Sequence, residues 1–260
     1  MSTLRFDVIT LFPELFAPFL QTGVTRRAWT DERMLLKLWN PREHATGNYR
    51  RVDDRPFGGG PGMVMLAEPL ARCLAAAQAD RRSEEQGAEP TPVVLFSPIG
   101  QRLNHAAVQG WATGSGAILV CGRYEGIDQR FIDRHVTHQI SLGDFVLSGG
   151  EIAALALLDA VARLQPGVLG DAGSHQLDSF NPALGGLLDC PHYTRPETWQ
   201  GQDVPAELLG GHHARIRQWR RAQSLQLTAR HRPDLLAAAR AAGQLTPQDE
   251  QTLAALGNAP

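Results

Sequence analysis

The sequence predicts an α/β domain with a mostly parallel sheet, followed by a small all-α region. Up to about residue 165, short apolar runs alternate with stretches of helical periodicity, the pattern typical of a parallel sheet with helical crossovers. Beyond that point only helical patterns remain. The 260 residues are 43% hydrophobic, which is enough for one large or two modest globular domains.

Five short apolar runs predict strands, because each is rich in branched or aromatic residues. They are Leu4–Thr10, Met34–Trp39, Val93–Ser97, Ala117–Cys121 and Val136–Ser141. The helical stretches between them are Pro13–Gln21, Ala67–Ala79, His105–Ala112 and Glu151–Leu164. The last is apolar on nearly every face, as is typical of a helix buried inside a protein or at a subunit interface. In parallel sheets, ligands gather in the loops beyond the carboxyl ends of the strands.

Two polar segments interrupt this pattern. Residues 80–91 predict a surface loop, and Gln165–Gly186, rich in Gly, Pro, Asp and Ser, predicts a long linker. Four short helices are expected afterwards, at Ala206–Leu209, Ala214–Thr228, Pro233–Ala242 and Pro247–Leu256. The predicted boundaries are therefore 1–164 for the α/β domain, 165–190 for a flexible linker and 191–260 for the helical domain.

The charge is unevenly distributed along the chain. A formal net charge of −2 argues at first against a nucleic-acid partner. However, residues 212–232 contain six arginines and no acid, so this window carries +6 and the remainder −8. Two histidines open the window and Trp219 lies within it, a combination suited to phosphates and a stacked base. A solvated arginine-rich helix face explains the charge equally well.

Several classes of protein are excluded or disfavoured. No apolar run reaches the roughly 18 to 20 residues of a membrane span, and no secretory signal opens the chain, so a cytoplasmic protein is expected. The three cysteines are far apart, which excludes a CxxC metal site and argues against disulfides. Cys121 ends an apolar strand and is interpreted as a buried small hydrophobe rather than a nucleophile. The motifs GxSxG and HExxH are absent from the sequence.

Four loops hold most of the glycine. Arg55–Met63 could cradle a phosphate, but it lacks the Gly-Lys-Ser/Thr ending of a P-loop, which disfavours a nucleotidase. Ser97–Arg102, Cys121–Asp128 and Ser141–Glu151 each follow a predicted strand, and their glycines allow a close approach of backbone to a ligand. The alternative for Cys121–Asp128 is a turn with a surface ion pair.

The predicted linker carries carboxylates, including Asp171 and Asp178. A carboxylate on a segment that closes over a strand-end pocket is suited to act as a general base. A turn residue or a helix cap is the alternative interpretation.

Taken in order, these segments resemble the bacterial tRNA (guanine-N1)-methyltransferases of the SPOUT class. The matching segments span nearly the whole chain: Ile9–Phe16, Val52–Met63, Cys121–Asp128, Gly143–Glu151, Pro166–Gly170, Leu187–Pro196, Gly211–Ala214 and Ile216–Arg220. The resemblance implies a deep trefoil knot in the α/β domain. It also implies S-adenosylmethionine as methyl donor, Mg²⁺, a homodimer with shared active sites and no membrane.

The resemblance also implies the site residues. The donor would be bound by Ser97, Pro98, Gly100, Gly122, Tyr124, Glu125, Gly126, Ser141, Leu142, Gly143, Asp144, Phe145, Val146, Leu147, Gly149 and Gly150. The reaction would methylate N1 of the guanine 3′ of the tRNA anticodon, at position 37. Asp178 would be the general base, Arg163 would stabilise charge on O6 and Ser174 would support them.

For the RNA, the resemblance implies binding of the anticodon stem-loop, with G next to the anticodon, by Asp54, Gly59, His213, Arg215, Arg217 and Arg220. The metal ligands stay unassigned. Two alternatives remain open. A related enzyme could modify another RNA site, such as a ribose 2′-oxygen, and a non-catalytic RNA-binding module could use the arginine window alone.

Overall fold

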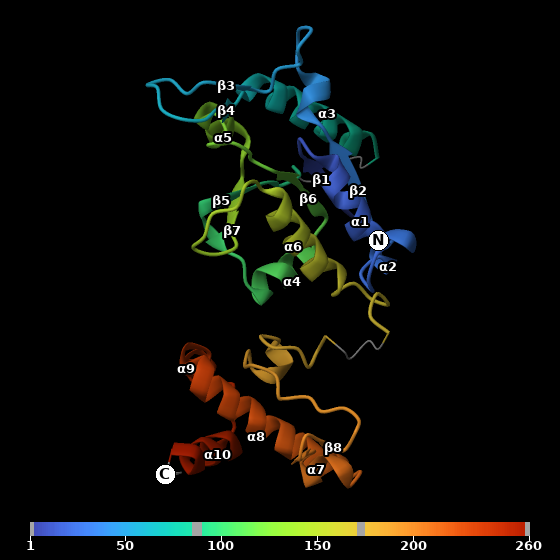
Figure 1. Ribbon diagram of the computed structural model, residues 1–260, viewed down its shortest axis with the longest axis vertical. Coiled ribbons are helices and arrows are strands. Elements are labelled where there is room, and N and C mark those ends of the chain that lie inside the picture. Colours follow the sequence, from blue (N-terminus) through green and yellow to red (C-terminus); the bar gives the residue numbers. More distant parts are fainter. Residues whose placement is uncertain (1–2, 85–89, 171–174, 258–260) are drawn as a thin grey trace. The chain divides into compact units, whose positions relative to one another are not determined.

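The computed structural model describes residues 3–84, 90–170 and 175–257 (Figure 1). The chain divides into two compact units, Met1–Gly170 and Asp171–Pro260. The first unit contains the main sheet and the second is largely helical.

Five strands form the sheet of the first unit, in the order β2-β1-β6-β5-β7, and every neighbouring pair is parallel. Their bounds are β1 Leu4–Ile9, β2 Met34–Trp39, β5 Val93–Arg102, β6 Gly116–Val120 and β7 His138–Ser141. All residues of β1 and β6 are buried, because helices cover both faces of the sheet. The predicted α/β class with a mostly parallel sheet is confirmed.

The helices form two layers, one on each face of the sheet (Figure 1). α1 Phe16–Gln21, α2 Arg27–Thr30, α4 His105–Thr113 and α6 Glu151–Ala162 pack on one face, against Phe6, Val8 and Leu119. α3 Ala67–Glu84 and α5 Gln129–His135 pack on the other, against Ile118 and Val120. The alternation along β6 sends successive side chains to opposite layers, as a strand period of two requires.

The short elements complete the first unit. They are the 3₁₀ helices η1 Pro13–Leu15 and η2 Pro41–His44, and the hairpin strands β3 Asp53–Asp54 and β4 Val64–Met65. The hairpin joins the Cys121–Asp128 loop, since Met65 donates its backbone N–H to the Gly126 carbonyl at 2.9 Å.

The predicted surface loop at 80–91 is wrong in its first part, because α3 continues to Glu84; residues 85–89 lie outside the described residues. Asp80 accepts from Lys37 Nζ at 2.7 Å, and the buried Arg81 donates to Asp7 Oδ2 at 2.8 Å. Arg5 also pairs with Asp7 at 2.8 Å. Polar residues therefore extend the helix because they find charged partners beneath it on the sheet.

The second unit contains α7 Ala206–Leu209, α8 His213–His231, α9 Pro233–Ala241 and α10 Pro247–Gly257, with η3 Pro182–Leu184 and the hairpin strands β8 Thr198–Trp199 and β9 Gln202–Asp203. Leu187, Leu225 and Ala239 form its buried core. Arg221 fixes α10 to α8 through two bonds to Asp249, at 2.8 and 2.9 Å. In the described residues, no helix combines the length and apolar character needed to cross a membrane.

Candidate functional site

A cavity of about 390 Å³ opens at the carboxyl ends of β5, β6 and β7. This volume lies in the range of small-molecule sites. Its walls come from three segments: Leu95–Pro98 of β5, the loop that follows β6 up to Ile127, and the segment from Ile140 to Gly150. Three of the four predicted glycine-rich loops are thus brought together in one place, as expected for a parallel sheet.

Fourteen of the sixteen residues predicted to bind the methyl donor line this cavity. They are Ser97, Pro98, Gly122, Tyr124, Glu125, Gly126, Ser141, Leu142, Gly143, Phe145, Val146, Leu147, Gly149 and Gly150. The other two, Gly100 and Asp144, are described but do not line it. Asp144 instead pairs with Arg102 at 2.8 Å, and its side chain is 89% exposed.

Gly100 is a glycine for a packing reason. β5 bulges away from β7 between Phe96 and Gln101, and this excursion brings Ser97 and Pro98 to the cavity. Where the strand returns, a Cβ on Gly100 would lie 2.5 Å from the backbone nitrogen of Ile140. Only glycine lets the two strands resume pairing there.

Backbone groups and apolar side chains dominate the walls. Tyr124 has a φ of 61° and Gly143 a φ of 156°, so both backbones turn in ways that are uncommon for ordinary residues. Phe145 is 57% exposed and Val146 91% exposed. Such apolar side chains at the rim of a cavity are typical of a surface that a ligand or another protein covers.

A buried carboxylate, that of Glu151, holds two of these loops together. Glu151, the first residue of α6, is fully buried and accepts from Thr10 Oγ1 at 2.8 Å. Its Oε2 lies 2.9 Å from Arg123 Nε, an ion pair whose angle is too poor for a hydrogen bond. Arg123 also donates to the Ser148 carbonyl at 3.2 Å and lies 4.4 Å from the Phe12 ring centroid. Arg123 and Ser148 line the cavity, whereas Thr10, Phe12 and Glu151 do not.

The predicted RNA-contact residues of the first unit lie on the β3–β4 hairpin. Asp54 accepts from Arg51 at 3.2 Å, and Gly59 lies in the exposed turn with a φ of 79°. A Cβ on Gly62, in the same loop, would lie 2.3 Å from Glu125 Oε1, a cavity-lining residue. The hairpin loop is therefore in contact with one wall of the cavity.

The predicted RNA-contact residues of the second unit lie at the start of α8. The side chains of His213, Arg215, Arg217 and Arg220 are exposed there. Arg220 also lines a second cavity, of about 530 Å³, together with His192, Tyr193 and Arg195. Trp219 packs edge-on against Tyr193, with 6.1 Å between the ring centroids.

The predicted catalytic residues belong to different units. Arg163 is the partly buried C-cap of α6 in the first unit, and Asp178 is a partly buried turn residue of the second. The Asn181 backbone N–H donates to the Asp178 carbonyl at 3.2 Å, and the Asp189 N–H donates to Ser179 Oγ at 2.9 Å. Ser174 lies outside the described residues.

Cysteine chemistry and a metal centre receive little support. The prediction that Cys121 is a buried hydrophobe is confirmed, and burial raises the pKa of its thiol well above the usual value. In the part of the chain that the structure describes, one group, Asp189, Cys190 and His192, places three possible metal-ligand atoms within 4.8 Å of one another. Burial also raises the pKa of Cys190, and a thiol is a poor ligand for Mg²⁺.

The comparison with protein families agrees with this arrangement. The family model described as tRNA (Guanine-1)-methyltransferase TrmD matches residues 4–238. The chain belongs to this family. Its relatives named tRNA (guanine-N(1)-)-methyltransferase include a protein of Paracidovorax citrulli, 70% identical over 97% of this chain and 98% of that protein. A protein of Polaromonas sp. is 69% identical over 97% of both chains, and one of Bordetella pertussis is 57% identical over 97% and 98%.

Several residues on the wall of the donor cavity were not predicted from the sequence motifs. Gln129 and Ile132 of α5 and Ala153 of α6 line the cavity, although they lie outside the glycine-rich loops. Gln129 and Ile132 lie three positions apart, on one side of a helix. Recognising α5 from its N-cap, Asp128, would have been the signal for both.

Proposed function

We propose that this chain transfers a methyl group from S-adenosylmethionine to N1 of the guanine 3′ of the tRNA anticodon, at position 37. The observation that carries the proposal is the strand-end cavity, whose walls contain nearly all the residues that the family resemblance assigns to the donor. The names of the relatives support the same reaction.

The cavity residues would hold the donor, which supplies the methyl group when bound. The backbone of the half-buried Gly122, Gly126 and Gly143 on the cavity wall can meet polar groups closely, and Phe145, Val146 and Leu147 can cover apolar parts of the ligand. The bulge at Ser97 and Pro98 brings a third strand end to the same ligand. A trefoil knot, which the family resemblance implies, would fix these loops in place.

Asp178 would accept the proton from N1, because a neutral guanine carries a proton on that nitrogen and cannot attack while it remains. Arg163 would stabilise the negative charge that then develops on O6. Ser174 would assist the base or the bound guanine. The two charged residues belong to different units, so we propose that bound RNA and a homodimeric partner complete the site.

Exposed apolar residues next to the cavity support the homodimer. Ile152 of α6 is 53% exposed, Val146 is 91% exposed, and Leu155 of α6 is partly exposed. Apolar groups gathered at the rim of a site are typical of a protein interface. Mg²⁺ is proposed as an accompanying cation, but the one group of three possible ligand atoms in the described residues includes a thiol, so no protein ligand is assigned to it.

The substrate would be the anticodon stem-loop of a cytoplasmic tRNA. His213, Arg215, Arg217 and Arg220 would contact its phosphates, while Tyr193 and Trp219 offer aromatic faces for a base. In the first unit, Asp54 and Gly59 would contact the guanine or its neighbour. Arg221, in contrast, is held by Asp249 and serves the fold.

The test is methyl transfer by the purified protein to a tRNA transcript with G at position 37 and G before it, with Mg²⁺ in the buffer and mapping of the methylated atom. We expect N1-methylguanine; a methylated ribose 2′-oxygen would favour the related enzyme. Titration with S-adenosylmethionine in a calorimeter separates an enzyme from a pure RNA binder, which would show no heat of donor binding.

Asp178→Asn should abolish transfer while donor binding stays unchanged. Asp203→Asn is the matched control, since Asp203 is an exposed carboxylate of the same unit that accepts from Thr198 at 2.6 Å. Normal turnover by Asp178→Asn would remove Asp178 from the role of base.

A further inference from the structure

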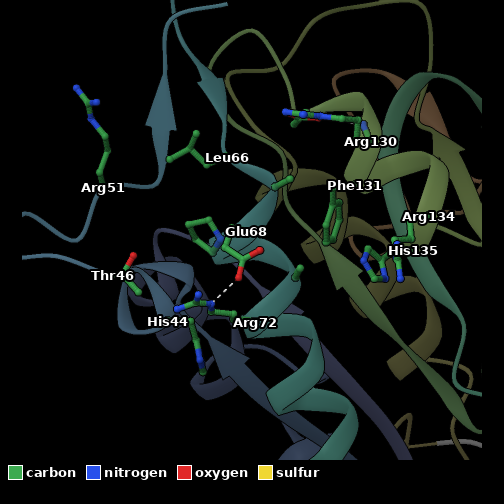
Figure 2. Close-up of a pocket in the computed structure, with 14 residues that line it drawn as sticks. His44, Thr46, Arg51, Leu66, Glu68, Arg72, Arg130, Phe131, Arg134 and His135 are labelled. Atoms are coloured by element: carbon green, nitrogen blue, oxygen red, sulfur yellow. Dashed lines mark hydrogen bonds and ion pairs between the residues drawn. The ribbon is translucent and has the colours of Figure 1, made fainter.

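The first unit contains another cavity, of about 660 Å³, whose walls are rich in arginine and histidine (Figure 2). It lies outside all the residues assigned above to the donor and to the RNA. The charged and imidazole side chains on its walls are His44, Arg51, Glu68, Arg72, Asp128, Arg130, Arg134 and His135. With both histidines neutral, these residues give the cavity a charge of +2.

The helix α5 separates this basic cavity from the donor cavity. Gln129 and Ile132 line the donor cavity, whereas Arg130, Phe131 and Arg134 line the basic one. A helix is about 10–12 Å across with its side chains, so the two cavities lie roughly one helix diameter apart. Three stacked nucleotides cover about the same distance, at about 3.4 Å each.

The arginines of the basic cavity can turn toward a ligand at little cost. Arg72 pairs with Glu68 at 2.7 Å and Arg130 with Asp128 at 2.6 Å, but the arginine side chains are 48% and 79% exposed. Exposed ion pairs of this kind contribute about 0–1 kcal/mol. The side chain of Arg134 is exposed and forms no hydrogen bond or ion pair with another side chain of the described residues. Its charge is therefore available to an anion.

The remaining walls suit a ligand with a sugar-phosphate chain. Leu66 is a partly exposed apolar residue between the charged groups, whereas the lining residues Pro69 and Phe131 are themselves buried. Phe131 stands among the labelled arginines in Figure 2, and its ring centroid lies 5.1 Å from that of His135. Burial, and then the charge of Arg134, lowers the pKa of His135 and so favours its neutral imidazole. The positive charge comes from guanidinium groups, which match phosphate oxygens with paired N–H donors.

We propose that the basic cavity binds backbone phosphates of the same tRNA whose guanine enters the donor cavity. This inference rests on the proposed function, because it takes the RNA to be the substrate. It adds a second phosphate-binding surface, on the α/β unit, to the arginines of α8. The cavity contacts phosphates and no base, so it contributes affinity that does not depend on sequence.

The test compares tRNA binding by three single variants at several salt concentrations. Arg134→Gln and Arg51→Gln each remove one guanidinium from the cavity. Arg82→Gln is the matched control, because Arg82 is an exposed arginine at the far end of α3 from the cavity. Arg134→Lys keeps the charge. Donor binding, measured by calorimetry on every variant, reports whether the α/β unit is intact.

We expect Arg134→Gln and Arg51→Gln each to raise the Kd for tRNA about three- to tenfold and to reduce the slope of log K against log salt by about 0.7–0.9. Arg82→Gln and Arg134→Lys should keep the wild-type slope, and donor affinity should stay constant throughout. An unchanged Kd and slope in both glutamine variants would overturn the inference. A second result would also overturn it: the glutamine variants lose binding of inorganic pyrophosphate but bind tRNA like the wild type. The cavity would then be a site for small anions.

The same experiment separates this inference from the proposed function. If the wild-type protein methylates the transcript but the glutamine variants bind tRNA normally, only the second phosphate surface is wrong. If the wild-type protein binds the donor but methylates no tRNA, the proposed function itself fails.

Discussion

Replacing Glu151 with Gln should destabilise the α/β unit and loosen the donor cavity. Glu151 is fully buried and contacts Thr10 and Arg123. The side chain of Arg123 is 18% exposed. Breaking a buried ion pair by removing one partner costs about 3–5 kcal/mol. Because Arg123 keeps some solvent, the Ser148 carbonyl and the Phe12 ring, we expect about 2–3 kcal/mol.

The effect should reach the donor because Arg123 and Glu151 connect the loop after β6 to the segment before α6. If the whole cost appears as local opening of these loops, donor affinity falls by about 30- to 150-fold, at 1.4 kcal/mol per tenfold. Urea unfolding would measure the free energy of unfolding, and calorimetry would measure donor affinity.

Glu68→Gln is the matched control for this experiment. Glu68 also pairs with an arginine, Arg72, but the two side chains are 70% and 48% exposed. Such a helical i,i+4 pair contributes about 0.3–0.5 kcal/mol. If Glu151→Gln unfolds at the same urea concentration as Glu68→Gln and binds the donor as well as the wild type, the assignment of Glu151 as a positioning residue is refuted.

Three further predictions follow from single contacts. Gly100→Ala should lower the free energy of unfolding in urea by about 1–3 kcal/mol, because its Cβ would collide with β7. Gly110→Ala is the control: a Cβ there meets no atom within 4 Å, so this change in α4 should raise the free energy of unfolding by about 0.5–1 kcal/mol. Equal effects of the two changes would refute the close approach of Gly100 to β7. Arg221 holds the pKa of Asp249 at about 2, so the ionised carboxylate contributes about 2 kcal/mol to the free energy of unfolding above pH 4. This contribution is lost as the pH falls toward 2. Asp249→Asn should therefore abolish this pH dependence of thermal unfolding, and a profile unchanged from wild type would contradict the prediction. Arg217→Gln should weaken tRNA binding with an unchanged Tm, whereas Arg221→Gln should lower the Tm, and a shared phenotype would show that one role is misassigned.

The sheet could be predicted because its strands are short runs of mostly apolar, branched or aromatic residues, which is a local property of the sequence. Helix α5 could not be predicted, since Gln129–His135 contains only two apolar residues, Phe131 and Ile132. Two helical turns with so few apolar residues show no clear hydrophobic period. The end of α3 was missed for a different reason. Asp80 and Arg81 resemble a polar loop, and only their partners Lys37 and Asp7, more than forty residues away, make the helix continue.

The donor cavity could be predicted in part because glycines mark places where backbone must turn or approach closely. Glycine spacing does not show which loops share a side-chain anchor. Thr10 and Glu151 are 141 positions apart, and the carboxylate becomes informative only when β1 and α6 lie next to each other. Conversely, Gly100 was predicted to bind the ligand, but a glycine is required there because a side chain would collide with the neighbouring strand β7.

Charge was the least reliable guide, because windows of sequence do not follow the surface of the fold. The window at 212–232 carries +6, yet Arg221 is neutralised by Asp249 and Arg232 pairs with Asp234 at 2.7 Å. Conversely, the remaining −8 includes four arginines, from three separate segments, that line the basic cavity beside α5. An RNA approaching the protein responds to charge within about 10 Å, the screening length at 0.1 M salt. The cavity should therefore attract a phosphate even though the sequence around each of its arginines contains acids that offset their charge.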